Sequence, residues 1–144
     1  MYVKDFMHTA VTTVTPDTLA RTAYQMMTMR GERMRHLPVV TAEQTLVGVI
    51  TDRDVRRAAA SDAPYMAEHE LTYLLEKLCV RDIMTRQVVT VHDTTPIVEA
   101  GQIFLQKKFG CLPVVRDDHT LVGIITVTDL LRAYIAQHEA ERRD

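Results

Sequence analysis

The stretch GVITDRD at residues 48–54 returns 75 residues later as GIITVTD at residues 123–129. Both copies keep a glycine, two aliphatic residues, a threonine and, three residues further on, an aspartate. Thr-x-x-Asp where a helix begins is a capping-box pattern, in which side chains satisfy the first free N–H groups of the helix. The same hydroxyl and carboxylate could equally form half of a ligand clamp. Both interpretations therefore have to be weighed against the rest of the chain.

The remainder of the sequence repeats in the same order. VKDFMHTAVTTV at residues 3–14 matches VRDIMTRQVVTV at residues 80–91, at an offset of 77 residues. HLPVV and TLVGVITDRDVRRA match CLPVV and TLVGIITVTDLLRA at an offset of 75 residues. The first copy therefore has two extra residues, which fall within TMRGERMR at residues 28–35. A unit of about 55 residues occurs twice, and such self-similarity indicates two copies of one structural unit.

Each copy predicts the element order strand, helix, strand, strand, helix. The short strands are expected at residues 11–14 and 88–91. Thr15 is expected to cap the first helix with Pro16 in its first turn, and Asp93 is the corresponding cap in the second copy. Two aliphatic runs joined by a polar turn then predict a hairpin, and a second helix follows from Thr51 or Thr126.

The glycine that precedes the final aliphatic run lies inside a predicted strand in both copies. Glycine at such a position indicates a bulge or the close approach of another group. Between the copies, leucines at helical spacing predict an amphipathic helix that packs over the joint or contributes to a dimer. These leucines are Leu71, Leu74, Leu75 and Leu78.

Composition limits the class of protein. The chain has 144 residues, of which 47% are hydrophobic and 25% charged, as in ordinary globular domains. The net charge of -2 argues against nucleic-acid binding by bulk electrostatics. Its two cysteines have no metal-ligand spacing, and neither a signal-peptide run nor a membrane-length apolar run occurs. We expect a soluble, cytoplasmic protein with reduced thiols.

No pattern in the sequence predicts catalysis. A glycine-rich phosphate loop, a nucleophile elbow and paired catalytic carboxylates are all missing. The histidines show no metal-ligand spacing, so surface or turn positions are expected for them. Besides His36, which is considered below, they are His8, His69, His92, His119 and His138.

The doubled unit with VxDxM, LPVV and LVGxIT followed by aspartate resembles the cystathionine-beta-synthase (CBS) domain, over residues 3–136. A tandem of two such domains forms a CBS pair, or Bateman module. The resemblance implies a mixed α/β (α+β) fold whose two sheets pack face to face about a pseudo-two-fold axis. It places one CBS domain at residues 1–60, a helical linker at residues 61–79 and a second CBS domain at residues 80–144.

The resemblance also implies a function. CBS pairs of this kind are regulatory sensors that bind adenosine-containing ligands in two clefts between the repeats, usually as homodimers. AMP, ADP or ATP are the expected ligands, with S-adenosylmethionine or NAD as further candidates and no cofactor required. Since no catalytic or channel domain follows, a stand-alone pair would transmit occupancy to a separate effector protein or to the dimer itself.

The chemistry of the repeated motif fits an adenosine ligand. A carboxylate can accept hydrogen bonds from both hydroxyls of a ribose, and charge-assisted bonds of this kind are strong. A hydroxyl at the start of a helix, beside free N–H groups, suits a phosphate. Thr51 with Asp54, and Thr126 with Asp129, supply both kinds of group.

The resemblance distributes further residues over the two clefts, each drawing on both repeats. Cleft A would combine Thr51, Arg53 and Asp54 with Arg81, Val89 and Cys111. Cleft B would combine Thr126, Thr128 and Asp129 with Lys4, Thr12, Arg35 and His36. Because Arg35 and His36 occupy positions where phosphate-binding cations occur in such modules, we expect cleft B to prefer a phosphorylated ligand.

Three alternatives remain open at this point. The first is a structural interaction module whose clefts stay empty, although two intact Thr-x-x-Asp motifs argue against it. The second is nucleic-acid binding through RGERMRH at residues 30–36 and RDVRR at residues 53–57, which the net charge does not favour. The third is an enzyme with a cryptic site.

Overall fold

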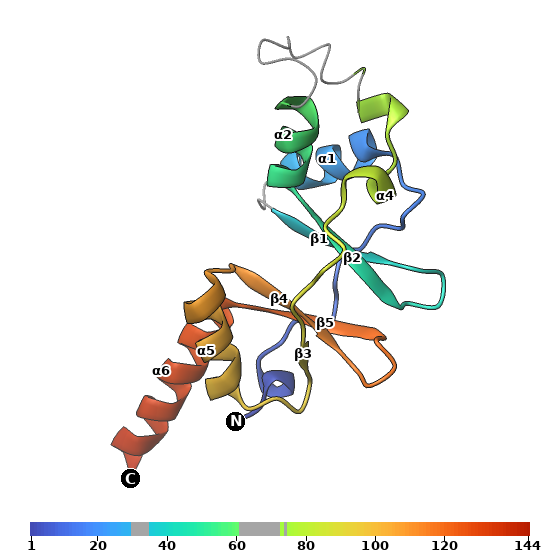
Figure 1. Ribbon diagram of the computed structural model, residues 1–144. Coiled ribbons are helices and arrows are strands. Elements are labelled where there is room, and N and C mark those ends of the chain that lie inside the picture. Colours follow the sequence, from blue (N-terminus) through green and yellow to red (C-terminus); the bar gives the residue numbers. More distant parts are fainter. Residues whose placement is uncertain (30–34, 61–72, 74) are drawn as a thin grey trace. The chain divides into compact units, whose positions relative to one another are not determined.

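The computed structural model describes residues 1–29, 35–60, 73 and 75–144 (Figure 1). These residues form two compact units. Unit 1 consists of residues 1–11 and 89–144, and unit 2 consists of residues 12–88. The units therefore do not follow the sequence repeats. Residues 1–11 of the first repeat lie in unit 1 with most of the second repeat, and residues 80–88 of the second repeat lie in unit 2 with most of the first. This arrangement is called the exchange below, and each of the two stretches is called an exchanged segment.

Unit 2 is built on a two-stranded antiparallel sheet. Its elements are α1 (Ala20–Met29), β1 (His36–Val40), β2 (Leu46–Thr51), α2 (Asp52–Ala60) and α4 (Val80–Ile83). The register of β1 and β2 pairs His36 with Thr51 and Val39 with Gly48. Its buried core includes Leu37, Ile50, Leu75 and Val80.

Unit 1 repeats this plan with one additional short strand. Its elements are the 3-10 helix η1 (Val3–Asp5), β3 (Val91–His92), α5 (Ile97–Lys107), β4 (Cys111–Val115), β5 (Leu121–Thr126) and α6 (Val127–Arg143). The sheet order is β3-β4-β5, with β3 parallel to β4 and β4 antiparallel to β5. Helices α5 and α6 pack side by side (Figure 1). The core includes Val3, Val91, Leu112 and Ile125.

The predicted mixed α/β fold and the repeated element order are confirmed, although the first strand of each copy is shorter than expected. In the first copy only Val14 pairs, in an isolated bridge to Val39. In the second copy the strand is confined to Val91–His92. The face-to-face packing of the two sheets stays a prediction. Of the predicted linker helix, Leu75 is buried, whereas Leu71 and Leu74 lie outside the described residues.

The first helix of each copy begins later than its sequence indicates. We predicted helix starts at Thr15 and Asp93, but α1 begins at Ala20 and α5 at Ile97. The intervening carbonyls accept hydrogen bonds from the exchanged segment instead of from the helix. In unit 2, Pro16 O and Thr18 O accept from Arg81 N and Val80 N, and in unit 1, Asp93 O and Thr95 O accept from Lys4 N and Val3 N.

The in-strand glycines lie where the exchanged segment crosses the hairpin. A Cβ atom on Gly48 would lie 2.8 Å from Met84 Sδ and 2.9 Å from Thr85 O. On Gly123 it would lie 2.8 Å from both Met7 Sδ and His8 O. The register also shifts beside each glycine, so the predicted close approach and irregularity are both confirmed. Because protein atoms account for both glycines, these residues do not separately indicate a ligand.

No helix in the described part of the chain is long and apolar enough to cross a membrane.

Candidate functional site

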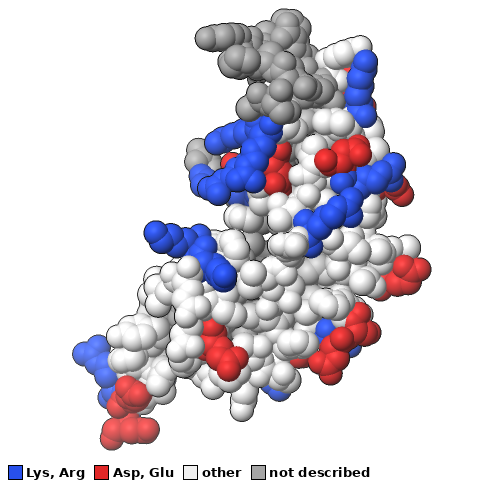
Figure 2. Space-filling view, in the orientation of Figure 1, with Lys and Arg blue, Asp and Glu red and all other residues white. Residues whose placement is uncertain are grey.

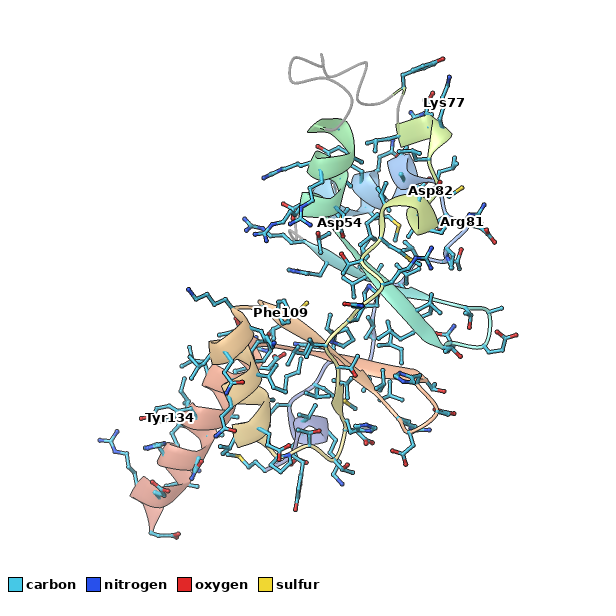
Figure 3. All side chains as sticks on the ribbon, viewed as in Figure 1. Asp54, Lys77, Arg81, Asp82, Phe109 and Tyr134 are labelled. Carbon is cyan, nitrogen blue, oxygen red and sulfur yellow. The ribbon has the colours of Figure 1, made fainter. Side chains whose placement is uncertain are left out.

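The first Thr-x-x-Asp pair lies where β2 ends and α2 begins. Oδ2 of Asp54 accepts hydrogen bonds from the backbone N–H of Thr51 at 2.9 Å and from its hydroxyl at 3.1 Å. The hydroxyl oxygen of Thr51 accepts in turn from the Asp54 N–H at 3.1 Å. Asp54 is only 7% exposed, and it lies at the start of α2 in Figure 3. The capping interpretation is therefore confirmed for this motif.

A third donor reaches Asp54 from the exchanged segment. The hydroxyl of Thr85 donates to Oδ1 at 3.0 Å. Two backbone hydrogen bonds with Val49 hold Thr85 in place. An ionised carboxylate has about four acceptor positions. Within residues 12–88 as described, Asp54 uses three of them, which leaves one position on Oδ1 open. Thr51, Asp54 and Thr85 are called the Asp54 site below.

The second pair has the same geometry at the junction of β5 and α6. Oδ2 of Asp129 accepts from the Thr126 N–H at 2.8 Å and from its hydroxyl at 2.9 Å. The Thr126 hydroxyl oxygen accepts from the Asp129 N–H at 3.3 Å. Asp129 is 1% exposed and thus more deeply buried than Asp54. The cap is confirmed here too.

The remaining oxygen of Asp129 has two donors instead of one. Nε2 of His8 lies 2.9 Å from Oδ1, and Nη1 of Arg132 donates to the same atom at 3.0 Å. Since an ionised carboxylate can only accept, His8 must donate through Nε2. All four acceptor positions are then filled. Thr126, Asp129, His8 and Arg132 are called the Asp129 site below.

Sequence reasoning missed three of these donors. His8 was expected at the surface; its side chain is indeed 52% exposed, but it has a definite partner in Asp129. Thr85 and Arg132 were not singled out. The signal for His8 and Thr85 was available, because the alignment of FMHTAV with IMTRQV places them opposite each other in the two copies.

The other predicted site residues are divided between the two units. Arg53, Arg81, Thr12, Arg35 and His36 belong to unit 2, and Lys4, Val89, Cys111 and Thr128 to unit 1. Each predicted cleft draws on residues from both units, so the assembly of cleft A and of cleft B stays a prediction.

Most of the predicted cations are solvent-exposed. Arg53 and Arg35 lie at the surface of unit 2, and Lys4 lies over the ring of Tyr2 at 5.7 Å. Arg81 on α4 forms an ion pair with Asp17 (Figure 3 labels Arg81). The hydrogen bond from Arg81 to the Asp17 carboxylate raises the pKa of Arg81, which keeps the guanidinium charged. Its pairing with Asp17 leaves Arg81 a weaker candidate for phosphate binding than Arg53.

His36 and Cys111 occupy counterpart positions at the start of β1 and β4, opposite Thr51 and Thr126. Burial lowers the pKa of His36 from its ordinary value of 6.5, with Asp52 opposing and Arg35 reinforcing that shift. Burial raises the pKa of Cys111 to about 11. Both side chains are therefore neutral near pH 7, because burial disfavours the charged form of each.

Across the described residues, no group of three or more His, Cys, Asp or Glu side chains has the arrangement of a metal site.

The duplicated unit agrees with a known family. The family model of the CBS domain matches residues 3–61 and, again, residues 80–136. This chain belongs to the CBS domain family. A CBS domain-containing protein of Dictyostelium discoideum is 36% identical over 132 residues, which cover 90% of this chain and 88% of the relative.

Solved structures share the fold of this CBS pair. CBSX2, a CBS-pair protein of Arabidopsis thaliana solved in complex with AMP, is 31% identical with a TM-score of 0.77, over 95% of this chain and 98% of that one. The CBS domain pair of protein MJ0100, in complex with 5'-methylthioadenosine and S-adenosylmethionine, is 26% identical with a TM-score of 0.73, over 95% and 98% of the two chains.

Proposed function

We propose that this CBS pair is a regulatory module that binds an adenosine-containing ligand through a Thr-x-x-Asp site and transmits occupancy to a partner protein. The observation that carries the proposal is the Asp54 carboxylate, which is buried at the start of α2 yet keeps one acceptor position open among the described residues. A ribose hydroxyl is a donor of the kind that this position accepts.

The ligand class is supported by relatives. The structures of CBSX2 and MJ0100 contain AMP, 5'-methylthioadenosine and S-adenosylmethionine, which share the adenosine group. Among these, a phosphorylated ligand is favoured at the Asp54 site and not, as we first expected, at the Asp129 site of cleft B. Arg35, which we had assigned to cleft B, belongs to unit 2, and both it and Arg53 lie close enough to His36 to lower its pKa. Figure 2 shows basic side chains gathered near the start of α2 in this view.

The first test is thermal unfolding with AMP, ADP, ATP, NAD and S-adenosylmethionine. A ligand at a hundred times its dissociation constant stabilises the folded chain by about 2.7 kcal/mol, which shifts the midpoint by several degrees. Asp54→Asn should abolish the shift, whereas Asp118→Asn, a change of an exposed turn carboxylate, should keep it. If none of the five ligands shifts the midpoint, a structural interaction module becomes the better interpretation.

We propose a second copy of the chain as a further partner, so that the module forms a homodimer. Unit 1 exposes an apolar stripe at helical spacing on α6, formed by Val127, Leu131, Tyr134 and Ile135. Tyr134 points away from unit 1 in Figure 3. Burying such a stripe against its symmetry mate is a common basis of homodimers. Leu131→Asp should convert the dimer to monomer in analytical ultracentrifugation, and the exposed change Glu139→Gln should not.

Transmission of occupancy requires that the ligand bind two states of the module with different affinity. The effector protein is therefore expected to recognise one of those states. No cofactor is needed for this role, and the proposed activity is binding rather than catalysis.

A further inference from the structure

We infer that the two Thr-x-x-Asp sites are not equivalent and that the Asp129 site is closed to a ligand by His8 and Arg132. The inference rests on the proposed function, because it concerns which carboxylate of the pair takes the ribose. It predicts that one chain binds one adenosine ligand, at the Asp54 site, although the motif is written twice.

The two sites share the capping half of their geometry. In each, Oδ2 accepts two hydrogen bonds from its own threonine, so this oxygen has no room for a ribose hydroxyl. The ligand must therefore use Oδ1. The donors on Oδ1 decide whether the site is open, and these are the donors that differ between the units.

Among the residues that the structure describes, Oδ1 of Asp54 has one donor, the neutral Thr85 hydroxyl. Arg57 is the counterpart of Arg132 in the first repeat, but within the part of unit 2 that the structure describes it forms no bond to Asp54. One hydroxyl of a ribose could thus donate to the open acceptor position of Oδ1. If the exposed Thr85 side chain rotated away, the acceptor position that it occupies would become available to the second ribose hydroxyl.

Oδ1 of Asp129 carries two donors, of which Arg132 is a cation and His8 becomes one when protonated. Hydrogen bonds from charged donors are about twice as strong as neutral ones. A ribose that entered this site would first have to displace at least one of them. The buried carboxylate is then fully satisfied without a ligand, so the site acts as a structural cap.

The two side chains that close the site are themselves largely exposed, at 52% for His8 and 63% for Arg132. Neither is a core residue, so both can be exchanged without leaving a cavity. This makes the closure testable by transplanting the donors of one site into the other.

The experiment is isothermal titration of the full chain with AMP and, separately, with S-adenosylmethionine. The wild-type chain should bind about one molecule, and the double variant His8→Thr/Arg132→Ala, which copies the Oδ1 donors of the Asp54 site, should bind about two. Thr85→His, which exchanges one Oδ1 donor of Asp54 for another and leaves the fourth acceptor position open, should still bind about one molecule. Thermal unfolding establishes that each variant is folded.

His8→Gln provides the matched control, because its amide restores a neutral donor on Oδ1 while Arg132 remains. This variant should still bind about one molecule, since all four acceptor positions stay filled. Should the double variant fail to fold, the wild-type stoichiometry still decides the question, because two equivalent sites would refute the closure. A change in stoichiometry is not an effect that lost stability alone would produce.

Two results would overturn the inference. Two equivalent sites in the wild-type chain, or a double variant that still binds only one molecule, would refute the closure and leave the proposed function intact. Failure of every variant and of the wild type to bind either probe would refute both, because there would be no ligand for the Asp54 site to accept.

Discussion

The two units have the same backbone frame and different side chains at the positions that determine chemistry. In both, the exchanged segment crosses the hairpin beside a glycine, and a buried aspartate caps the second helix. Yet Thr85 in unit 2 corresponds to His8 in unit 1, and His36 corresponds to Cys111. The frame is thus fixed by a few small or capping residues, while the donors around each carboxylate have diverged.

The helix faces have diverged as well. Where α6 exposes Val127 and Leu131, the counterpart positions on α2 are Asp52 and Arg56, which form an ion pair at 3.6 Å. In Figure 2 the surface over α5 and most of α6 is largely uncharged, whereas charged side chains gather around α2. The second helix of unit 1 therefore exposes an apolar stripe, and that of unit 2 exposes charged side chains at the same positions.

The largest expected effect tests the exchange itself. Leu37→Ala and Leu112→Ala, each in a fully buried position, should lower the free energy of unfolding by about 2–5 kcal/mol. Val3→Ala should couple with Leu112→Ala by about 0.5 kcal/mol or more and be additive with Leu37→Ala, since Val3 shares a core with Leu112. Urea denaturation of the single and double variants measures this. Coupling of Val3 to Leu37 instead would contradict the exchange.

The second prediction tests whether the exchanged segment approaches the hairpin glycine equally closely in both units. Gly48→Ala and Gly123→Ala should each lower the free energy of unfolding by about 1–3 kcal/mol, because the new Cβ would meet a backbone oxygen. Gly101→Ala on α5 is the control, since its Cβ would lie at an ordinary 3.6 Å from Leu130 Cδ1. This change should stabilise the chain by up to about 1 kcal/mol. Equal effects of all three changes would argue against the crossing.

The third prediction compares the two carboxylates. Asp129→Asn should lower the free energy of unfolding by about 1 kcal/mol more than Asp54→Asn, because Asp129 has an additional charged donor. Chemical denaturation at low ionic strength measures the difference, and high salt should reduce it, since His8 and Arg132 are exposed. An equal loss in both variants would indicate that the Oδ1 donors of Asp129 contribute little.

The smallest effect concerns pH. The pKa of His36 is lower in the folded chain than its ordinary value of 6.5, so the unfolded chain binds more protons between those two values. Stability conferred by neutral His36 is complete above pH 6.5 and is lost as the pH falls through 6.5 toward the folded value. His36→Cys, which introduces the counterpart residue of unit 1, should flatten thermal stability against pH in this window. An unchanged slope would remove His36 as its source.

Local patterns in the sequence were sufficient for much of this structure. The starts of α2 and α6 after Thr51 and Thr126 follow from a capping pattern that spans four residues. The hairpins and the close approach at Gly48 and Gly123 likewise follow from short stretches. The caps and hairpins depend on neighbours in the chain, which is why a single sequence is enough to predict them. The segment that approaches each glycine comes from the other repeat, and only the glycine itself marks it in the local sequence.

The features that were missed depend on residues far apart in the chain. α1 begins at Ala20 because residues 78–81 take the backbone groups that would have extended it toward Thr15. His8 bonds to Asp129, 121 residues away. Composition and spacing do not reveal such contacts, although the offset between the two copies identifies His8 and Thr85 as counterparts. The set of residues that lines each predicted cleft also depends on contacts between residues that are far apart in the chain.

The exchange has a consequence for how the chain folds during synthesis. Unit 2 is continuous in sequence, so all its residues are present once residue 88 has been made. Residues 1–11 leave the ribosome before the rest of unit 1, and the Thr95 carbonyl that accepts from Val3 is made on the order of ten seconds later at about 5–20 residues per second. We therefore expect stalled nascent chains to protect unit 2 from protease before unit 1. Residues 1–11 would lack their hydrogen-bond partners in unit 1 until β5 has been translated.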